Sequence, residues 1–407
     1  MIARIRRMSG RDPQESHRAA TPLELLFDLA FVVAFGQAAD QLSHFVADAN
    51  PLPGIVGFTF AIVCICWAWI NFSWFASAYD TDDWFYRLCT MVQMIGVVVF
   101  SLGIPAFFDS LAAGGPVDNA VPVLGYVTMR VALIGQWLRA ARGDPARRRT
   151  AMGYVYFVGG AQLGWIVTGM IGFGQAAFFT IAVLLFAVEL VAPILAERKT
   201  SGTPWNAYHI AERYGLLAII ALGEGVFGTV AVVSVVVQEQ GWSTEAVLII
   251  VAGIGLTFGL WWTYFMIPSG QVLSVHRERS TAWSYGHIPL YGSIAAIGAG
   301  LHIAALVVEG DAHIDTLGAI VAVVVPALIF TLVFYGLYTQ LLRTFDLFHI
   351  GLFAGTVAML AIAVALAANG ASMGACLIVV TLAPAVPVVG WELLGNRHQA
   401  EALQRMT

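Results

Sequence analysis

Two carboxylates, Glu24 and Asp28, lie one helical turn apart inside the apolar stretch from Thr21 to Gln37. Their spacing of four residues places both on one face of a helix. Thr21 and Pro22 are typical of an N-cap and a first helical position, and the free N–H groups of a helix start favour an acid such as Glu24. Asp28 lies deeper, where charged side chains usually face inward and are paired. Two hypotheses follow for Asp28: a contact between helices, or the binding of a solute or ion.

Arg130 and Glu224 fall near the middle of two later apolar segments. A guanidinium does not lose its proton in proteins, so Arg130 needs a carboxylate, carbonyl groups or water around it. The sequence predicts an ion pair between Arg130 and Glu224, as a structural clamp or as part of a solute or ion site. On this basis Glu224→Gln is expected to destabilise the protein more than Asp28→Asn, because Asp28 lies nearer to water.

Three polar residues, His209, Glu212 and Arg213, share one face at the start of the segment that carries Glu224. We expect Glu212 and Arg213 to contact Asp28 or the acidic loop 80–83. For His209 the choice is between protonation near neutral pH and a role at the helix start.

The remaining motifs give no sign of catalysis. His287 and His302 lie at opposite ends of one predicted helix, about 22 Å apart by helical rise, too far to share one metal ion. The sequence contains no phosphate-binding glycine loop, zinc-binding pair of histidines or nucleophile elbow. We therefore expect neither an enzyme nor a cofactor, metal or nucleic-acid partner.

The elements that position these residues are predicted from composition. The chain has 407 residues, of which 59% are hydrophobic and 11% charged. Soluble domains are nearer one quarter charged, so the sequence predicts an all-α polytopic membrane protein. Runs of about 20 apolar residues mark candidate spans. Twelve are found, at 22–42, 54–76, 86–108, 119–140, 151–171, 174–196, 208–236, 246–268, 283–308, 314–341, 349–368 and 371–394.

The charges predict how these spans are oriented. If the basic N-terminal tail is cytoplasmic, twelve spans gather the basic residues on that side, and of 20 only Arg130 lies deep inside a span, since Arg87, Arg139 and Arg213 lie at cytoplasmic span ends. Both termini are then cytoplasmic, on the inner side of a plasma membrane. The basic loop 139–149 fits this topology, and anionic-lipid binding by the loop is a further hypothesis.

An internal duplication is also predicted. The segment L-F-D-L-A-F-V-V-A-F-G-Q, ending at Gln37, aligns with R-Y-G-L-L-A-I-I-A-L-G-E, ending at Glu224. Gln37 therefore occupies the place in the first half that Glu224 occupies in the second. Six spans in each unit give a parallel repeat. The predicted organisation is a basic tail at 1–20, six-helix repeats at 21–197 and 198–395, and a short cytoplasmic tail at 396–407.

Two motifs together resemble a known family. L-E-L-L-F-D-L-A-F-V begins at Leu23, and H-I-A-E-R-Y-G-L-L-A-I-I-A-L-G-E runs from His209 to Glu224. This combination is similar to the bacterial low-temperature-requirement A family, whose members are polytopic membrane proteins associated with growth in the cold. The resemblance covers nearly the whole chain. It implies membrane residence and no particular reaction.

Three functions remain open. The first is a secondary transporter or ion-translocating protein that binds a small solute or cation at intramembrane charges. The second is a cation channel, because Phe27-Asp28 partly resembles the Phe-Ser-Asp motif of lysosomal and bacterial potassium channels; the serine is missing, and Tyr214-Gly215 stands in the second half. The third is a protein that binds or organises membrane lipids. A homodimer is a further hypothesis. The candidate binding residues are Glu24, Asp28, Gln37, Arg130, His209, Glu212, Arg213, Glu224 and His287.

Overall fold

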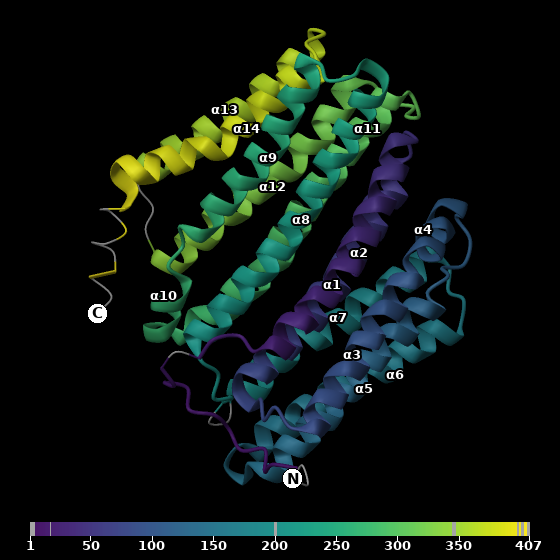
Figure 1. Cartoon of the computed structure of the whole chain (residues 1–407). Coiled ribbons are helices and arrows are strands. Elements are labelled where there is room, and N and C mark those ends of the chain that lie inside the picture. The colour runs from purple at the N-terminus through teal and green to yellow at the C-terminus, as the bar shows by residue number, and fades with distance from the viewer. Residues whose placement is uncertain are drawn as a thin grey trace. The chain divides into compact units, whose positions relative to one another are not determined.

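The computed structural model describes residues 5–16, 18–198, 202–343, 347–396, 399 and 403–404, and these ranges contain helices and no named strand. The α-helices are α1 (Pro22–Ala47), α2 (Pro51–Tyr79), α3 (Trp84–Leu102), α4 (Ile104–Ala113), α5 (Ala120–Gly143), α6 (Arg148–Met170), α7 (Gln175–Arg198), α8 (Ala207–Gln240), α9 (Thr244–Phe265), α10 (Ser269–Val275), α11 (Ser280–Glu309), α12 (Thr316–Leu342), α13 (Leu347–Ala368) and α14 (Met373–Gly390) (Figure 1). The short helices are η1 (Pro145–Arg147), η2 (Arg277–Arg279) and η3 (Trp391–Gly395), the last a π-helix.

Each predicted span falls on one of these helices, with boundaries that differ by a few residues. The third span is divided at Gly103, where α3 ends and α4 begins. In the described part of the chain, 11 helices are long and apolar enough to cross a membrane. Helix α6 is not among them, although it has 23 residues. Its glycines and Gln162 dilute its apolar residues, so the prediction of twelve spans is supported for all but α6.

Local signals in the sequence explain where the first helices begin. The Thr21 hydroxyl accepts a hydrogen bond from the Glu24 backbone N–H at 3.2 Å, and the Glu24 carboxylate accepts one from the Thr21 N–H at 2.8 Å. This reciprocal pair is a capping box. Helix α3 begins after Asp83, whose carboxylate accepts a hydrogen bond from the Tyr86 N–H at 2.9 Å. The N-cap predicted at Thr21 is therefore confirmed.

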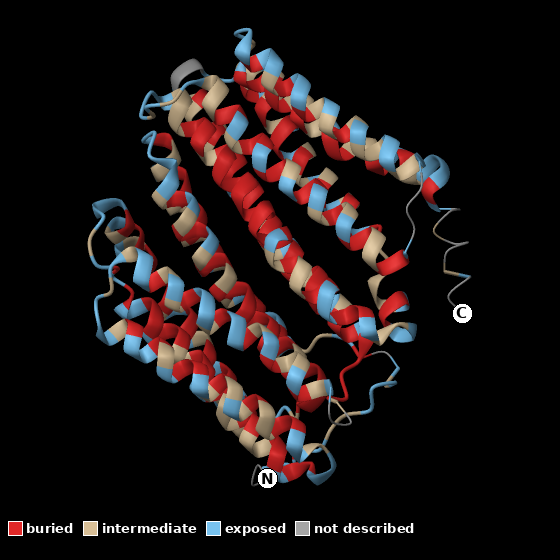
Figure 2. Ribbon diagram, turned by 180° about the vertical axis from the view of Figure 1, so that it is seen from behind, coloured by how far each residue is buried: buried red, intermediate tan, exposed pale blue. Residues whose placement is uncertain are grey.

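The helices group into two compact units. Unit 1 contains the residues up to Ala38 together with Val63–Arg213, and unit 2 contains Ala39–Ile62 together with the residues from Tyr214 onward. Within unit 1, α5 packs against α3 and α6, and α6 against α7. Within unit 2, α11 packs against α12, and α14 against α9 and α13. In each unit the buried positions follow the helix faces that meet other helices (Figure 2).

The units follow other boundaries than the predicted repeats, because α1, α2 and α8 each contribute residues to both. The duplication at 21–197 and 198–395 and the cytoplasmic location of both termini stay predictions. Part of each predicted tail lies outside the described residues.

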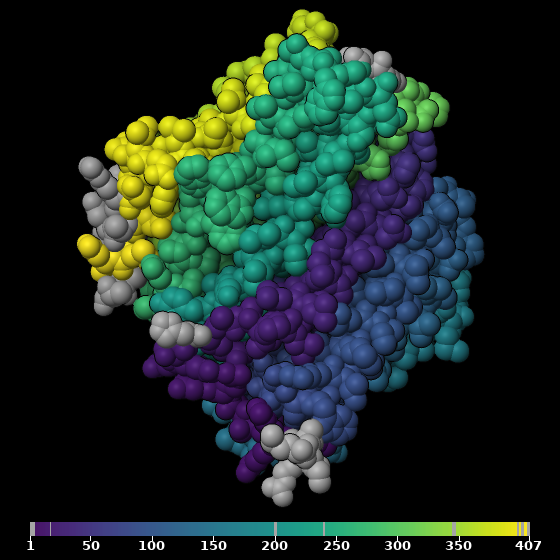
Figure 3. Space-filling view, viewed as in Figure 1, coloured from purple at the N-terminus to yellow at the C-terminus, as the bar shows by residue number. Residues whose placement is uncertain are grey.

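The segment before α1 lies on the surface of unit 1 (Figure 3, purple) and is held by hydrogen bonds to distant parts of that unit. The Arg6 backbone N–H donates to Asp83 at 3.0 Å, and the Gly10 N–H donates to Asp144 at 3.2 Å. Asn206, just before α8, donates to the carbonyl oxygens of Pro13 and Glu15. These contacts bring residues 5–20 to the ends of α2, α5 and α8, beside the first candidate site.

Candidate functional site

The first cluster of buried charges lies where α1 and α8 begin. We call it the Arg213 cluster; its members are Arg18, Glu24, Asp28, Trp69, His209 and Arg213, all in unit 1 and all buried. Arg213 contacts both carboxylates: its Nη1 lies 3.0 Å from Glu24 Oε1, and its Nη2 lies 2.5 Å from Asp28 Oδ1. A second hydrogen bond, from Arg213 Nε to Asp28 Oδ2, measures 3.1 Å. The contact between Arg213 and Asp28 expected from the sequence is present.

Further donors complete the shell around the two carboxylates. The Trp69 indole N–H donates to Asp28 Oδ1 at 2.7 Å, and His209 Nε2 lies 3.2 Å from Glu24 Oε1. Arg18 Nη2 lies 3.8 Å from the same Glu24 oxygen. Two guanidinium groups therefore face two carboxylates, and the charges balance without a protonated His209. Such balance is what allows ionised groups to stay buried.

His209 and Glu212 lie at the edge of this cluster. The His209 backbone N–H donates to the Asn206 side chain at 3.0 Å, which caps α8. Glu212 is exposed, and its carboxylate accepts a hydrogen bond from the Ala20 N–H at 3.1 Å. The structure thus brings together five of the residues proposed from sequence, namely Glu24, Asp28, His209, Glu212 and Arg213.

Next to this cluster, the loop between α2 and α3 carries two buried aspartates, Asp80 and Asp83, whose pKa values are shifted in opposite directions. Burial, together with the negative charge of Glu24, raises the pKa of Asp80 to about 6. Burial alone would also raise the pKa of Asp83. Hydrogen bonds from Arg139 and from the N–H groups of Tyr86 and Arg6 outweigh it and lower that pKa to about 2.

A second cluster surrounds Glu189, in the middle of α7. We call it the Glu189 cluster; its members are Trp67, Tyr126, Arg130, Gln162, Trp165 and Glu189, all buried in unit 1. The carboxylate accepts hydrogen bonds from five side chains, namely Trp67 at 2.7 Å, Tyr126 at 2.8 Å, Trp165 at 2.9 Å, Arg130 at 3.1 Å and Gln162 at 3.2 Å. This shell leaves no room on the carboxylate for another ligand.

The partner of Arg130 corrects a prediction. In the described part of the chain, Arg130 forms its ion pair with Glu189, at 3.1 Å, so the prediction that Glu224 neutralises it is wrong. Arg130 also donates to the Tyr126 hydroxyl at 2.6 Å, and its guanidinium carbon lies 4.6 Å from the centre of the Tyr126 ring. Depth in the membrane allowed both partners, and the direction in which each side chain points decided between them.

Glu224 contrasts with the other buried carboxylates. It lies in the middle of α8 and is 9% exposed, and the described residues give it neither a hydrogen bond nor an ion pair. A Cβ on Gly298 would come within 2.7 Å of the Glu224 backbone and Cβ, so α8 and α11 approach closely at this level. A Cβ on Gly228, one turn further along α8, would come equally close to the Gly298 backbone. The three described arginines of unit 2 lie far from this level, before or at the start of α11 (Arg277, Arg279) and after α12 (Arg343).

Three titratable side chains of unit 2, Asp40, His44 and His302, form a group toward the ends of α1 and α11. Asp40 is the charged residue that acts electrostatically on Glu224. Asp40 Oδ1 lies 3.6 Å from His44 Nε2 and 3.9 Å from His302 Nδ1, and the side chains of Asp40, His44 and His302 are 39%, 54% and 32% exposed. His302 is one helical turn beyond Gly298, about 6 Å along α11. The polar groups therefore run from the Glu224 level toward the ends of α1 and α11.

The last two predicted binding residues, His287 and Gln37, differ in their surroundings. His287 is buried in unit 2, where its Nδ1 lies 2.7 Å from the Trp283 carbonyl oxygen and its Nε2 lies 3.1 Å from the Tyr264 hydroxyl. A carbonyl oxygen only accepts, so Nδ1 carries a proton, and the Tyr264 hydroxyl is the partner of Nε2. Gln37 is half-buried in α1, in unit 1, and makes no hydrogen bond among the described residues.

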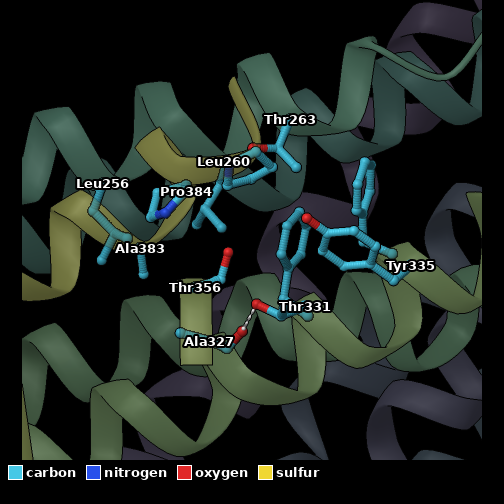
Figure 4. A pocket seen from close by; sticks show the side chains of 12 residues that line it. Leu256, Leu260, Thr263, Ala327, Thr331, Tyr335, Thr356, Ala383 and Pro384 are labelled. Atoms are coloured by element: carbon cyan, nitrogen blue, oxygen red, sulfur yellow. Dashed lines mark hydrogen bonds between the residues drawn. The ribbon is translucent and has the colours of Figure 1, made fainter. Parts of the chain in front are cut away.

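A pocket between α9, α12, α13 and α14 has different chemistry (Figure 4). The space between its lining side chains amounts to about 320 Å³ when the open space at its mouth is included. The hydroxyls of Thr263, Thr331 and Thr356 each donate to a carbonyl oxygen of their own helix. These three hydroxyls are engaged in this way, whereas the Tyr335 hydroxyl, which also lines the pocket, is buried without a hydrogen-bond partner among the described residues.

Sequence reasoning missed two parts of these sites. It did not predict the Glu189 cluster, although Tyr126 and Arg130 are four residues apart and could have been assigned to one face. It also treated His302 only as a test for a metal, and did not place Asp40 and His44 beside it. Asp40 and His44 share the same spacing of four, which was the available signal.

The comparisons with known proteins agree with the family resemblance of the two motifs that begin at Leu23 and at His209, which supply most of the Arg213 cluster. The family model for the bacterial low temperature requirement A protein matches residues 19–384. An uncharacterised protein of Rhizobium meliloti (strain 1021) is 24% identical over 301 residues, which cover 70% of this chain and 69% of that protein. No solved structure matches the chain. Because the family model covers most of the chain, Glu224 included, the chain belongs to the bacterial low temperature requirement A family of membrane proteins.

Proposed function

We propose that this protein is a secondary transporter or ion-translocating protein in which Glu224 binds the proton or cation that is moved. Asp40, His44 and His302 would form the polar route that connects Glu224 to water at one end of unit 2. The Arg213 and Glu189 clusters would hold helices of unit 1 together and take no ion.

One observation carries this proposal, namely the difference between Glu224 and the other carboxylates inside helices. Asp28 and Glu189 have an arginine and further donors, so a proton or cation would have to break existing hydrogen bonds. Glu224 has no such partner among the described residues. A carboxylate in a membrane interior without a counter-charge takes up a proton or a cation, and such residues mark ion pathways.

The neighbours of Glu224 support an exchangeable ion. The Ser43 hydroxyl donates to the Asp40 carbonyl oxygen at 2.7 Å and lies 3.2 Å from His302 Nδ1, so it can accept from that nitrogen. Histidine changes its charge near neutral pH, and chains of acids and histidines are typical of proton relays. The His313 backbone N–H donates to the Ala47 carbonyl oxygen at 2.7 Å, which places the ends of α1 and α11 together.

Reconstitution in liposomes tests the proposal. The protein would be placed in vesicles that contain a pH-sensitive dye, and a potassium diffusion potential would be imposed with valinomycin, in buffers with and without sodium. We expect ion movement that Glu224→Gln abolishes and that Asp40→Asn or His302→Gln slows. A response that needs sodium would identify a cation in place of a proton.

Asp48→Asn is the matched control, because Asp48 is also an acid at the end of α1, but its side chain is 62% exposed and faces solvent. It should leave the flux unchanged. Equal flux for wild type and Glu224→Gln, or none for folded wild type under any of these gradients, would rule the proposal out.

A further inference from the structure

We propose that the outer face of α6, with the basic patch at its start, binds an anionic phospholipid. The basic patch consists of Arg142, Arg148, Arg149 and Arg198, which are all exposed and all belong to unit 1. This site is separate from Glu224 and does not depend on the proposed transport.

The charges of the patch are not neutralised by ion pairs among the described residues. Among the described residues, the four arginines of the patch form no ion pair, whereas Arg139 and Arg147 nearby are paired with Asp83 and Asp144. The acids closest in sequence are occupied. Asp144 accepts from Arg147 and from the Gly10 N–H, and Glu197 accepts from Tyr154 at 3.0 Å and from Thr203. The positive charge of the patch is therefore available to a ligand from outside.

The patch lies at one end of two helices that pack together. The Tyr154 hydroxyl contacts Glu197, and a Cβ on Gly153 would lie 3.2 Å from the Ala196 side chain, so the start of α6 lies beside the end of α7. Arg198, the last residue of α7, is thereby brought to the same end as Arg148 and Arg149. Arg142 follows from the end of α5, which also packs on α6.

An exposed stripe continues from the patch along α6. Tyr156, Leu163 and Met170 are 70%, 68% and 80% exposed, and together with Arg149 they recur at every seventh residue, on one face of the helix. Arg149 and Met170 are about 31 Å apart by helical rise, close to the thickness of a bilayer's hydrocarbon core. The stripe thus has a cationic end, an amphipathic tyrosine and an apolar remainder, in the order of a phospholipid's own groups.

A glycine creates a shallow notch in this stripe. Gly160 lies between Tyr156 and Leu163, is exposed, and has no atom within 4 Å of the place where a Cβ would be. An acyl chain can follow the helix there without moving a side chain. The charge of the patch selects an anionic headgroup, because each arginine at a membrane surface attracts anionic lipid.

Native mass spectrometry of the purified full-length protein tests the proposal, with phosphatidylglycerol and phosphatidylcholine of identical acyl chains as probes. We expect phosphatidylglycerol to be retained preferentially. Each arginine removed should weaken its binding about fivefold, so Arg148→Gln with Arg149→Gln should largely abolish the preference. Gly160→Leu should reduce retention of the lipid without removing charge, and should leave thermal stability unchanged or higher because leucine favours helix.

The control is Arg343→Gln, since Arg343 is exposed but lies in unit 2. It should leave the preference unchanged, and glycerol 1-phosphate should not displace the lipid. Three results would each overturn the proposal: equal retention of the two lipids, an equal loss in Arg343→Gln, or displacement by glycerol 1-phosphate. A dimer that Gly160→Leu dissociates would likewise show that a second copy, and no lipid, covers this face.

Discussion

The buried charges of this protein differ in how completely they are satisfied, and that difference separates structure from function at the level of single residues. Glu189 accepts five hydrogen bonds and faces Arg130. Removing an ion from water costs several kcal/mol, which a close counter-charge and full hydrogen bonding can offset. A buried charge whose desolvation cost is offset in this way is part of the scaffold. Glu224 is not offset in this way among the described residues, which is why we propose a binding role for it.

We expect Glu189→Gln to lower thermal stability in detergent strongly, because it leaves the Arg130 guanidinium buried without its counter-charge. Breaking one side of a buried pair costs about 3–5 kcal/mol in soluble proteins, and water that enters a membrane site can reduce this figure. Combining Glu189→Gln with Arg130→Met should recover part of the loss, since the second change removes the unpaired charge. Thermal unfolding of the three variants measures this.

Glu224→Gln provides the contrast, because it replaces an acid of similar shape that has no partner among the described residues. It should change the melting temperature little. If Glu224→Gln destabilised the protein as much as Glu189→Gln, Glu224 would have a partner that its surroundings in unit 2 do not reveal.

Asp28→Asn should also be costly, and this reverses the ranking expected from sequence. The two bonds to Arg213 and the one from Trp69 make Asp28 a saturated carboxylate, despite its place near the start of α1. We expect a loss of about 3 kcal/mol or more, the range of a broken buried pair. Chemical denaturation can compare Asp28→Asn with Glu224→Gln. A smaller loss for Asp28→Asn would restore the original ranking.

The sequence predicted some of these contacts between helices and not others. The prediction that Glu212 and Arg213 contact Asp28 or the loop 80–83 is confirmed for Arg213, which meets Asp28, whereas Glu212 accepts from the Ala20 N–H. For Arg130 the sequence indicated only a depth in the membrane, which did not identify Glu189 as its partner. The direction of a side chain around its helix is set by which helices are neighbours, and a single sequence of nearly uniform hydrophobicity does not reveal that.

At the scale of elements, the N-terminal segment and the loop from Asp80 to Asp83 form one connected layer on unit 1. Arg139 pairs with Asp83 and donates to the Arg6 carbonyl oxygen at 2.7 Å, and Arg6 donates to the Thr81 carbonyl oxygen at 3.3 Å. The basic tail predicted to set orientation therefore also binds the loops that close this end of the unit.

This layer should make stability depend on pH in a defined direction. The pKa of Asp80 is about 6 in the folded protein, above its ordinary value near 3.9, so the folded state binds an extra proton between these pH values. Stability should therefore rise as the pH falls from about 7 to 4. Below pH 4 it should fall, because Asp83, with a pKa of about 2, loses its bonds to Arg139 as it is protonated.

Asp80→Asn isolates the rise in stability that protonation of Asp80 should cause between pH 7 and pH 4. At pH 7 it removes a charge held near Glu24 in a buried site and should raise the free energy of unfolding by at most about 3 kcal/mol, from a pKa difference of two units. The gain should vanish at pH 4, where wild-type Asp80 is protonated. Denaturant titrations at pH 7, 5 and 4 measure both values, and an equal gain at every pH would refute the assignment to Asp80. Asp82→Asn is the control, since Asp82 is the exposed acid of the same loop.

At the scale of the whole molecule, the sequence predicted the helices better than their grouping. Apolar runs placed each long helix within a few residues, because a membrane requires long apolar helices. The division into units was not predictable in the same way: α1, α2 and α8 contribute to both, whereas the predicted repeats assign each helix to one. A repeat in sequence describes ancestry, and compact units describe packing.

Helix α6 decides the topology of the whole chain. If it crosses the membrane, twelve spans alternate, the basic loop 139–149 is cytoplasmic, and both termini lie on that side. If α6 lies on the surface instead, the 11 more apolar helices place the two ends of the chain on opposite sides. We expect α6 to cross, because α5 and α7 pack along it and Gln162 and Trp165 face the buried Glu189. Single cysteines introduced at Gly172 and at Pro145 would be tested with a membrane-impermeant thiol reagent, after the four native cysteines have been replaced. Gly172 should be labelled from outside and Pro145 only after the cells are opened, and labelling of both from the same side would show that α6 does not cross.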